Sequence, residues 1–202
     1  VKDAEKLRQA GFEDEEILML RSTTDREELE RLVDLNVVCT VSSVDTGLAL
    51  NALAENRATV ACAHIQVDTG MGFGGFLVSE PEKILLAYRS LSNVALEGIY
   101  TQLHGMKPND PEAMRQLEQF HQVLDTIHQA GYETGVVHAA GSFALLHNDA
   151  ARLDGVRAGS AILGRCRRTR DDRLKTVGYG QVPLAEVRWL PKGHRLGTDR
   201  PI

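Results

Sequence analysis

The sequence lacks the features of several protein classes. None of its apolar runs approaches the ~20 residues of a membrane-spanning helix, so we expect no membrane span. It has only three cysteines, Cys39, Cys62 and Cys166, with no Cys-x-x-Cys pair. This pattern argues against a disulfide framework or a metal site and predicts buried thiols in a reducing compartment, the cytoplasm. The charged helical pattern at the start of the chain predicts that there is no signal peptide.

Neither sign of charge dominates. The formal net charge of −5 disfavours a nucleic acid as the main partner. With 43% hydrophobic, 25% charged and only 5% aromatic residues, the chain has the composition of an ordinary globular protein. Its 202 residues suit one or two domains, but a complete eight-stranded α/β barrel typically needs about 250 residues.

Short apolar runs alternate with amphipathic stretches. The apolar runs predict six strands, at residues 16–20, 37–41, 59–67, 95–103, 136–139 and 155–158. Helices are predicted over residues 3–10, after an N-cap at Asp25, over 46–55, from about 80 and over 111–130. The last helix should bury one stripe of side chains: Met114, Leu117, His121, Leu124 and Ile127 or His128. Strands that alternate with helices indicate βαβ units and a parallel sheet.

The character of the chain changes after Gly164, which divides it into residues 1–164 and 165–202. A basic segment follows, made of Arg165, Arg167, Arg168, Arg170, Arg173 and Lys175. It is typical of a solvated loop balanced by Asp171 and Asp172, with anion or nucleic-acid binding as the alternative. Partial alternation over residues 175–190 predicts antiparallel β structure, and residues 191–193 predict a turn. Residues 165–202 therefore look like a linker and the start of a β domain.

A glycine-rich loop follows the third predicted strand. Residues 67–76 read VDTGMGFGGF, and Gly70, Gly72 and Gly75 form a GxGxxG pattern. In a dinucleotide-binding protein such a loop cradles pyrophosphate at the start of a helix, and an acid about 20 residues on binds ribose. Here Glu97 stands at that distance, but inside a predicted strand, and the next helix starts late. A flexible loop at the rim of a barrel is the competing interpretation.

Two small-residue loops follow the last two predicted strands. One is HAAGS, from His138 to Ser142, and the other is VRAGS, from Val156 to Ser160. Small residues let an anionic ligand approach the backbone, and barrels often bind phosphate with their last two βα loops. The pair therefore predicts one shared phosphate site.

These loops, with EGIYTQL at 97–103 and DGVRAGSAILG at 154–164, resemble the landmarks of the alanine racemase family in order and spacing. Residues 174–197 are similar to the family's entry into its C-terminal β domain. The resemblance implies an incomplete TIM-type (β/α) barrel with about six of eight strands. It also implies a homodimer that binds pyridoxal 5′-phosphate (PLP) and racemises a small amino acid, alanine or serine, by removing and returning its α-proton.

The resemblance also implies residue roles. Ser142, with the backbone of Gly159 and Ser160, corresponds to the phosphate cradle. Arg157 corresponds to the arginine that hydrogen-bonds the pyridine nitrogen, a partner that limits the ring as an electron sink. His138 corresponds to the histidine that supports this arginine.

Several positions depart from the family pattern. Phe73 stands where the family has the arginine that contacts the phenolic oxygen, and Gln66 replaces the lysine that supports that arginine. Gln102 replaces the histidine that flanks the ring, for which His104, on the same face of a continued strand, could substitute. Gly141 replaces an asparagine before the phosphate serine.

The two groups that perform the family's chemistry have no clear match. The Schiff-base lysine belongs to a VKANAYG-like strand, and Lys2 resembles it only in its neighbours, a full β-α unit too close to residues 16–20. Tyr179 comes too early to match the catalytic tyrosine. Three hypotheses follow: a PLP-dependent racemase, a catalytically inactive truncated relative or oligomer subunit, and an unrelated nucleotide-binding α/β protein.

Overall fold

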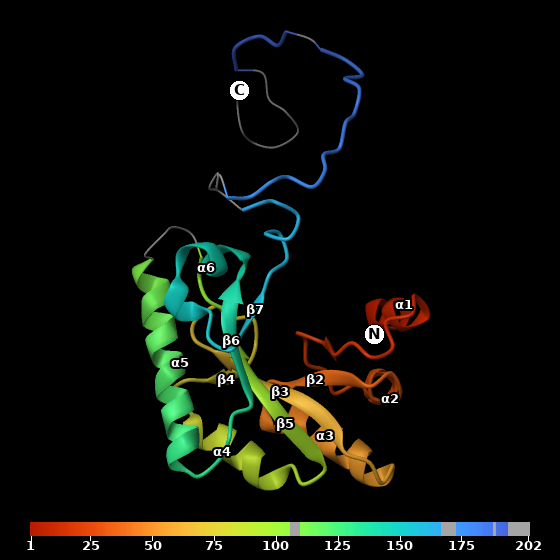
Figure 1. Ribbon diagram of the computed structural model, residues 1–202, viewed down its shortest axis with the longest axis vertical. Helices are drawn as coiled ribbons and strands as arrows, with labels where there is room; N and C mark the ends of the chain where they lie inside the picture. Colours follow the sequence, from red (N-terminus) through yellow and green to blue (C-terminus); the bar gives the residue numbers. More distant parts are fainter. Residues whose placement is uncertain (106–109, 167–172, 188, 194–202) are drawn as a thin grey trace.

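The computed structural model describes residues 1–105, 110–166, 173–187 and 189–193. The strands form one curled, parallel sheet with helices packed against it (Figure 1). The strand order is β1-β2-β3-β5-β6-β7, and the short β4 pairs with β3. Every pairing is parallel. The strands are β1 Ile17–Leu18, β2 Val37–Val41, β3 Ala61–Asp68, β4 Phe76–Leu77, β5 Val94–Thr101, β6 Val136–Gly141 and β7 Gly155–Arg157.

Helices connect successive strands, as expected of right-handed βαβ units. They are α1 Lys2–Gln9, α2 Arg26–Asp34, α3 Val44–Asn56, α4 Pro81–Ser90, α5 Pro111–Gln129 and α6 Ser142–His147, with a 3-10 turn at Asp149–Ala151. Local sequence explains their starts. The predicted N-cap Asp25 accepts a hydrogen bond from the Glu28 N–H, and Ser43 and Thr46 form a capping box. Asp110 caps α5, whose first residue is a proline.

The two faces of the sheet differ in character. On β3, Ala63, Ile65 and Val67 belong to the hydrophobic core shared with the helices, whereas His64 and Gln66 alternate with them on the other face. Both polar side chains are nevertheless buried. The buried hydrophobic side chains of the described residues run from Ala4 to Ala151. The sheet therefore has an apolar face against the helices and a polar face that can carry chemistry.

The six predicted strands are confirmed. β1 is shorter than predicted at both ends, and β5 and β7 end earlier than predicted. The structure adds β4 inside the glycine-rich loop. Gly75, with φ of +118°, lets the chain turn back against β3, because a Cβ there would lie 2.8 Å from the Asp68 backbone nitrogen. The fold is an incomplete TIM-type barrel, as predicted.

The predicted buried stripe of α5 is partly wrong. Leu117, Leu124 and Ile127 are buried as expected, but Met114, His121 and His128 are exposed. The helix instead buries Ala113, Gln116, Leu117, Phe120, Val123, Leu124 and Ile127.

The predicted β structure after residue 174 is also wrong where the chain is described. Residues 173–187 contain no strand, and the side chains of Tyr179 and Trp189 are largely exposed. The predicted turn at 191–193 is present at Lys192 and Gly193. Of the basic segment, Arg165 donates to the Gly178 carbonyl and Arg173 to that of Leu146. Arg167, Arg168 and Arg170, with Asp171 and Asp172, lie outside the described residues.

The three cysteines form no disulfide among the described residues, and only Cys39 is buried. Cys62 and Cys166 are partly exposed, so the prediction of buried thiols is wrong for these two. Among the helices that can be described, none has the length and hydrophobicity to cross a membrane.

Candidate functional site

Arg157, at the end of β7, joins the ends of β5, β6 and β7. Its Nη1 donates to His138 Nδ1 at 2.7 Å, and its Nη2 donates to the Thr101 carbonyl at 2.6 Å. Nη2 also donates to Gln102 Oε1 at 3.1 Å. The structure therefore brings together three residues that the sequence predicted separately: Arg157, His138 and Gln102.

The Arg157 contact fixes the tautomer of His138. A guanidinium can only donate, so His138 Nδ1 accepts, and a neutral ring then carries its hydrogen on Nε2. That nitrogen lies 3.0 Å from His64 Nδ1, to which it donates. Burial, Arg157 and His64 lower the pKa of His138 to about 3. Burial also lowers the pKa of His64. The hydrogen-bonded row of Arg157, His138 and His64 thus holds one positive charge, on Arg157.

Tyr100, on the neighbouring strand β5, packs against His138 and Arg157. Its ring stacks on His138, with the centroids 5.0 Å apart, and the Arg157 guanidinium carbon lies 5.3 Å from the Tyr100 centroid. The Tyr100 hydroxyl lies 3.0 Å from Thr40 Oγ1. Burial raises the pKa of Tyr100, which keeps the ring a neutral cation–π partner for Arg157.

Gly98 makes room for His64. A register shift between Ala63 and His64 pairs His64 with Gly98 of β5. A Cβ on Gly98 would lie 2.5 Å from His64 Cε1, well inside van der Waals contact. The histidine can therefore lie flat against the neighbouring strand only because that strand has a glycine there.

Ser142 links the two small-residue loops that the sequence predicts to share a phosphate site. Its Oγ accepts the N–H of Gly159 at 3.0 Å and that of Ala161 at 3.2 Å. Both lone pairs are used, so the hydroxyl hydrogen remains available to donate to an anion. Ser160 lies between these two residues, and its carbonyl accepts the N–H of Arg165. The sequence pattern missed Ala161, whose role depends on backbone geometry.

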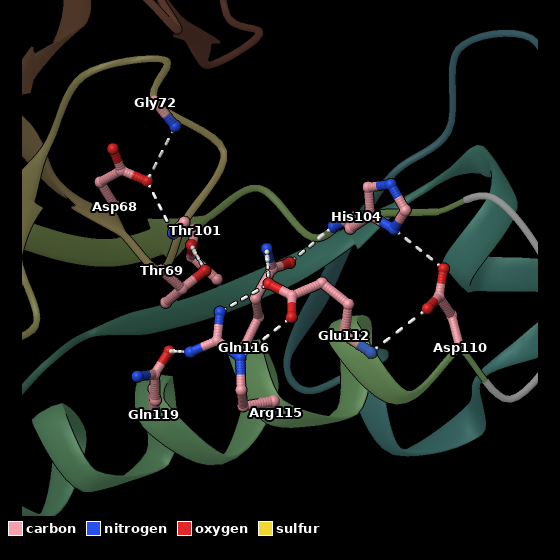
Figure 2. A network of polar contacts seen from close by, with 11 residues as sticks. Asp68, Thr69, Gly72, Thr101, His104, Asp110, Glu112, Arg115, Gln116 and Gln119 are labelled. Atoms are coloured by element: carbon pink, nitrogen blue, oxygen red, sulfur yellow. Dashed lines mark hydrogen bonds and ion pairs between the residues drawn. The ribbon is translucent and has the colours of Figure 1, made fainter.

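A cavity of about 300 Å³ opens beside this cradle. Its lining includes Gln102, His104, Gly141, Ser142 and Phe73. The expectation that His104 continues β5 is wrong, because the strand ends at Thr101. His104 reaches the cavity from the loop, held by Asp110 and Gln116 (Figure 2). The structure thus gathers Gln102, His104 and Ser142 around one space.

The glycine-rich loop satisfies its own amides. Asp68 Oδ1 accepts the N–H of Gly70 at 2.8 Å and that of Gly72 at 3.1 Å (Figure 2). These donors are therefore already paired and do not present an empty pyrophosphate cradle. Gln66 donates to the Phe73 carbonyl, while the Phe73 side chain is 70% exposed.

Lys2 is not brought to this site. It is the exposed first residue of α1, near β1, whereas Arg157 belongs to β7 at the other end of the strand order. Figure 1 shows α1 well separated from α6 and β7. Tyr179 is also remote from the fold's core, in an exposed extended segment. Within the described ranges, no group of three His, Cys, Asp or Glu side chains is placed to hold a metal ion.

The geometry agrees with comparisons to known proteins. A family model described as "Alanine racemase, N-terminal domain" matches residues 1–166. The chain belongs to the alanine racemase family. An alanine racemase from Carboxydothermus hydrogenoformans is 34% identical over 160 residues, covering 79% of this chain and 43% of that protein. One from Clostridium tetani is 30% identical over 207 residues, covering 99% of this chain and 53% of that protein.

Solved structures give the same family. An alanine racemase from Clostridium difficile 630 in complex with cycloserine superposes with a TM-score of 0.79 at 27% identity. The match covers 87% of this chain and 49% of that structure. This chain spans about half the length of the alanine racemases that it matches.

Besides Ala161, sequence reasoning missed three site residues, His64, Tyr100 and Asp110. His64 interrupts an apolar strand, which was the available signal, and the register then pairs it with Gly98. Tyr100 lies in the EGIYTQL motif, but its stacking on His138 depends on the pairing of β5 with β6. Asp110 stands in the position of a helix N-cap, but a cap pattern does not predict that its second carboxylate oxygen contacts His104.

Proposed function

We propose that this chain forms the phosphate- and ring-nitrogen-binding part of a PLP-dependent amino-acid racemase. The observation that carries the proposal is that Arg157 pairs with His138 and with Gln102, which lines the same cavity as Ser142. The Ser142 hydroxyl and the backbone N–H of Ser160 would donate to the phosphate, beside Gly159, whose own N–H already donates to Ser142 Oγ. Arg157 would donate to the pyridine nitrogen. The substrate is a small amino acid, alanine or serine.

The residues present suit these two ends of the cofactor. The cavity volume lies at the lower end of the range for small-molecule sites. A Cβ on Gly159 would meet nothing within 4 Å, so the backbone is open to an incoming phosphate. The phenolic-oxygen end is not matched in the same way, since Phe73 and Gln66 carry no charge.

Bound PLP supplies an electron sink for the bonds at the amino-acid α-carbon. Arg157 determines how strong that sink is. Neutral His138 occupies one side of the guanidinium without taking its proton, so Arg157 stays charged and donates without protonating the ring. A weaker electron sink favours removal and return of the α-proton over cleavage of other bonds of the amino acid.

A binding role without racemisation is the second candidate. The distance of Lys2 from the cavity favours it, because the family chemistry needs a lysine at the cofactor. Such a chain would retain PLP or act as a subunit of an oligomer. We propose a homodimer in either case, located in the cytoplasm, a compartment that suits cysteines that form no disulfide among the described residues.

Titration of the full chain with PLP and with pyridoxal, which lacks the phosphate, tests the site. We expect Ser142→Ala to weaken PLP binding roughly 10- to 100-fold, as for a hydrogen bond to a charged group, and to leave pyridoxal binding unchanged. Ser92→Ala, on the exposed surface, is the matched control. Equal affinity for PLP and pyridoxal in the unaltered chain would contradict the proposal.

Borohydride reduction followed by peptide mass mapping separates the two candidates. A reduced adduct at Lys2, with racemisation of alanine or serine, would support catalysis by this chain. PLP retention without an adduct or racemisation would support the binding role. Binding of NAD instead of PLP would contradict both.

A further inference from the structure

His104 lies in a loop, but both its backbone and its side chain are held by polar contacts. Its backbone N–H donates to Gln116 Oε1 at 2.7 Å, and Gln116 is almost fully buried on α5. Gln116 Nε2 in turn donates to Glu112 Oε1. The backbone of His104 is thus anchored to the first two turns of α5 (Figure 2).

The imidazole ring is anchored separately. His104 Nδ1 lies 2.9 Å from Asp110 Oδ2, whose side chain is only 7% exposed, and the other Asp110 oxygen caps α5 by accepting the Glu112 N–H. A carboxylate that accepts from Nδ1 selects the tautomer that carries its hydrogen there. Nε2 is then the free base, pointing away from Asp110 in Figure 2.

The free nitrogen belongs to a side chain that lines the cavity of Ser142. The His104 side chain is 33% exposed, and no hydrogen bond to its Nε2 is found among the residues that the structure describes. Both nitrogens of His138 are paired, since it donates to His64 and accepts from Arg157, and neither His138 nor His64 is among the residues that line this cavity. His104 is therefore the histidine of this cavity with a nitrogen left for a ligand.

We propose that His104, oriented by Asp110, is a catalytic base that exchanges a proton with the α-carbon of an amino acid bound in this cavity. The proposal rests on the proposed function. Nε2 takes the α-proton, so that the C–H bond breaks, an N–H bond forms and the electron pair stays on the substrate. Asp110 balances the charge of the imidazolium. Return of a solvent-derived proton from the same nitrogen exchanges hydrogen on one face without inverting the carbon.

The test uses the full chain with PLP and L-alanine in D2O, followed by proton NMR of the α-hydrogen. We expect exchange above that of free PLP, and a loss of roughly 100-fold or more in His104→Gln. Asp110→Asn retains a good N-cap for α5 and should slow exchange roughly tenfold or more. His121→Gln, on the exposed side of the same helix, should exchange at the unaltered rate.

Two further measurements show whether His104→Gln still binds PLP and whether Asp110 sets the tautomer of His104. PLP titration should give the same affinity for His104→Gln as for the unaltered chain. Nitrogen NMR of the histidines, without cofactor, should show His104 protonated at Nδ1, in a state that changes in Asp110→Asn.

Each outcome decides one of the two proposals. Unchanged exchange in His104→Gln, or no exchange above free PLP in a chain that binds PLP, overturns the role of His104 while the binding site stands. A hydrogen on Nε2 of His104 in place of Nδ1 also overturns it. Failure of the unaltered chain to bind PLP overturns the proposed function itself, and the role of His104 with it.

Discussion

The hydrogen bond between Arg157 and His138 can run in only one direction. Because Arg157 donates, His138 must accept at Nδ1 and donate at Nε2 to His64. A proton added to either histidine would face a donor or a neighbouring cation. At the residue scale, the site therefore depends on two histidines that stay neutral.

We predict that stability depends on pH through these histidines. The folded-state pKa of His138, about 3, lies below its ordinary value of 6.5, so the unfolded chain binds the proton first as pH falls. The stabilisation is complete above pH 6.5 and is lost as the pH falls toward 3. Urea unfolding at pH 7 and pH 5 should show the loss, with a slope of up to about 1.4 kcal/mol per pH unit from His138.

His138→Gln provides the comparison. This variant should be less stable at pH 7 but should have a flatter dependence on pH. A slope equal to that of the unaltered chain would show that folding does not lower the pKa of His138.

Gly98→Ala should destabilise the fold by about 1–3 kcal/mol, the usual range for overpacking. The added Cβ would press on the His64 ring, which cannot move without losing its bond to His138. Gly155→Ala is the matched control, because a Cβ there meets its nearest neighbour at an ordinary 3.8 Å. Equal stability of the two variants in urea would contradict this account.

At the element scale, α5 shows what periodicity can and cannot predict. Its limits were readable, because the predicted range 111–130 agrees with the observed Pro111–Gln129, whereas its N-cap Asp110 was not predicted. The orientation of its buried face was not, because Met114 and His121 were assigned to the core on spacing alone. Phe120, which is fully buried, was left out of that stripe.

The corrected face of α5 gives a prediction. Phe120→Ala should cost about 3–5 kcal/mol through loss of burial and the cavity left behind. His121→Ala, its exposed neighbour, should change the free energy of unfolding by less than about 0.5 kcal/mol. The denaturant midpoints of the two variants, compared at equal slope, measure the difference. Similar midpoints would contradict the burial of Phe120 and the exposure of His121.

Most of the fold and half of the site were readable from the sequence. The order of strands and helices follows from alternating apolar and amphipathic runs, and the Ser142 and Arg157 loops carry recognisable small residues. The strand β4 was not readable, because it depends on the positive φ of Gly75 and not on a hydrophobic pattern. His64 and Asp110 were missed because their roles arise from register and from a loop that returns to α5.

At the scale of the whole molecule, the sheet and the extended segment after β7 behave differently. The buried hydrophobic side chains of the described residues end at Ala151, whereas Val177, Tyr179 and Val182 are mostly exposed. Trp189, the single tryptophan, is fully exposed. This segment contributes little burial to the stability of the sheet.

We therefore predict that tryptophan fluorescence is insensitive to unfolding. Trp189 emission should stay that of a solvated indole across a urea titration, while circular dichroism reports a cooperative loss of helix. A shift in emission that coincides with the loss of helix would show that the segment packs in solution, on the sheet or on a second chain.

The residues around the cavity come mainly from two short stretches of the chain. Apart from Met71 and Phe73 of the glycine-rich loop, they are residues 102–105, directly after β5, and residues 141–144, at the end of β6 and the start of α6. β5 and β6 are neighbours in the sheet, and β7, which ends in Arg157, follows β6 in the strand order. Ligand binding here depends on few long-range loop closures. The segment from β5 to β7 could therefore be transplanted as one piece into a closed barrel of the same strand register, and it would carry Ser142, Arg157, His104 and His138 with it. The host barrel would have to supply the partner of His138, which here is His64 of β3.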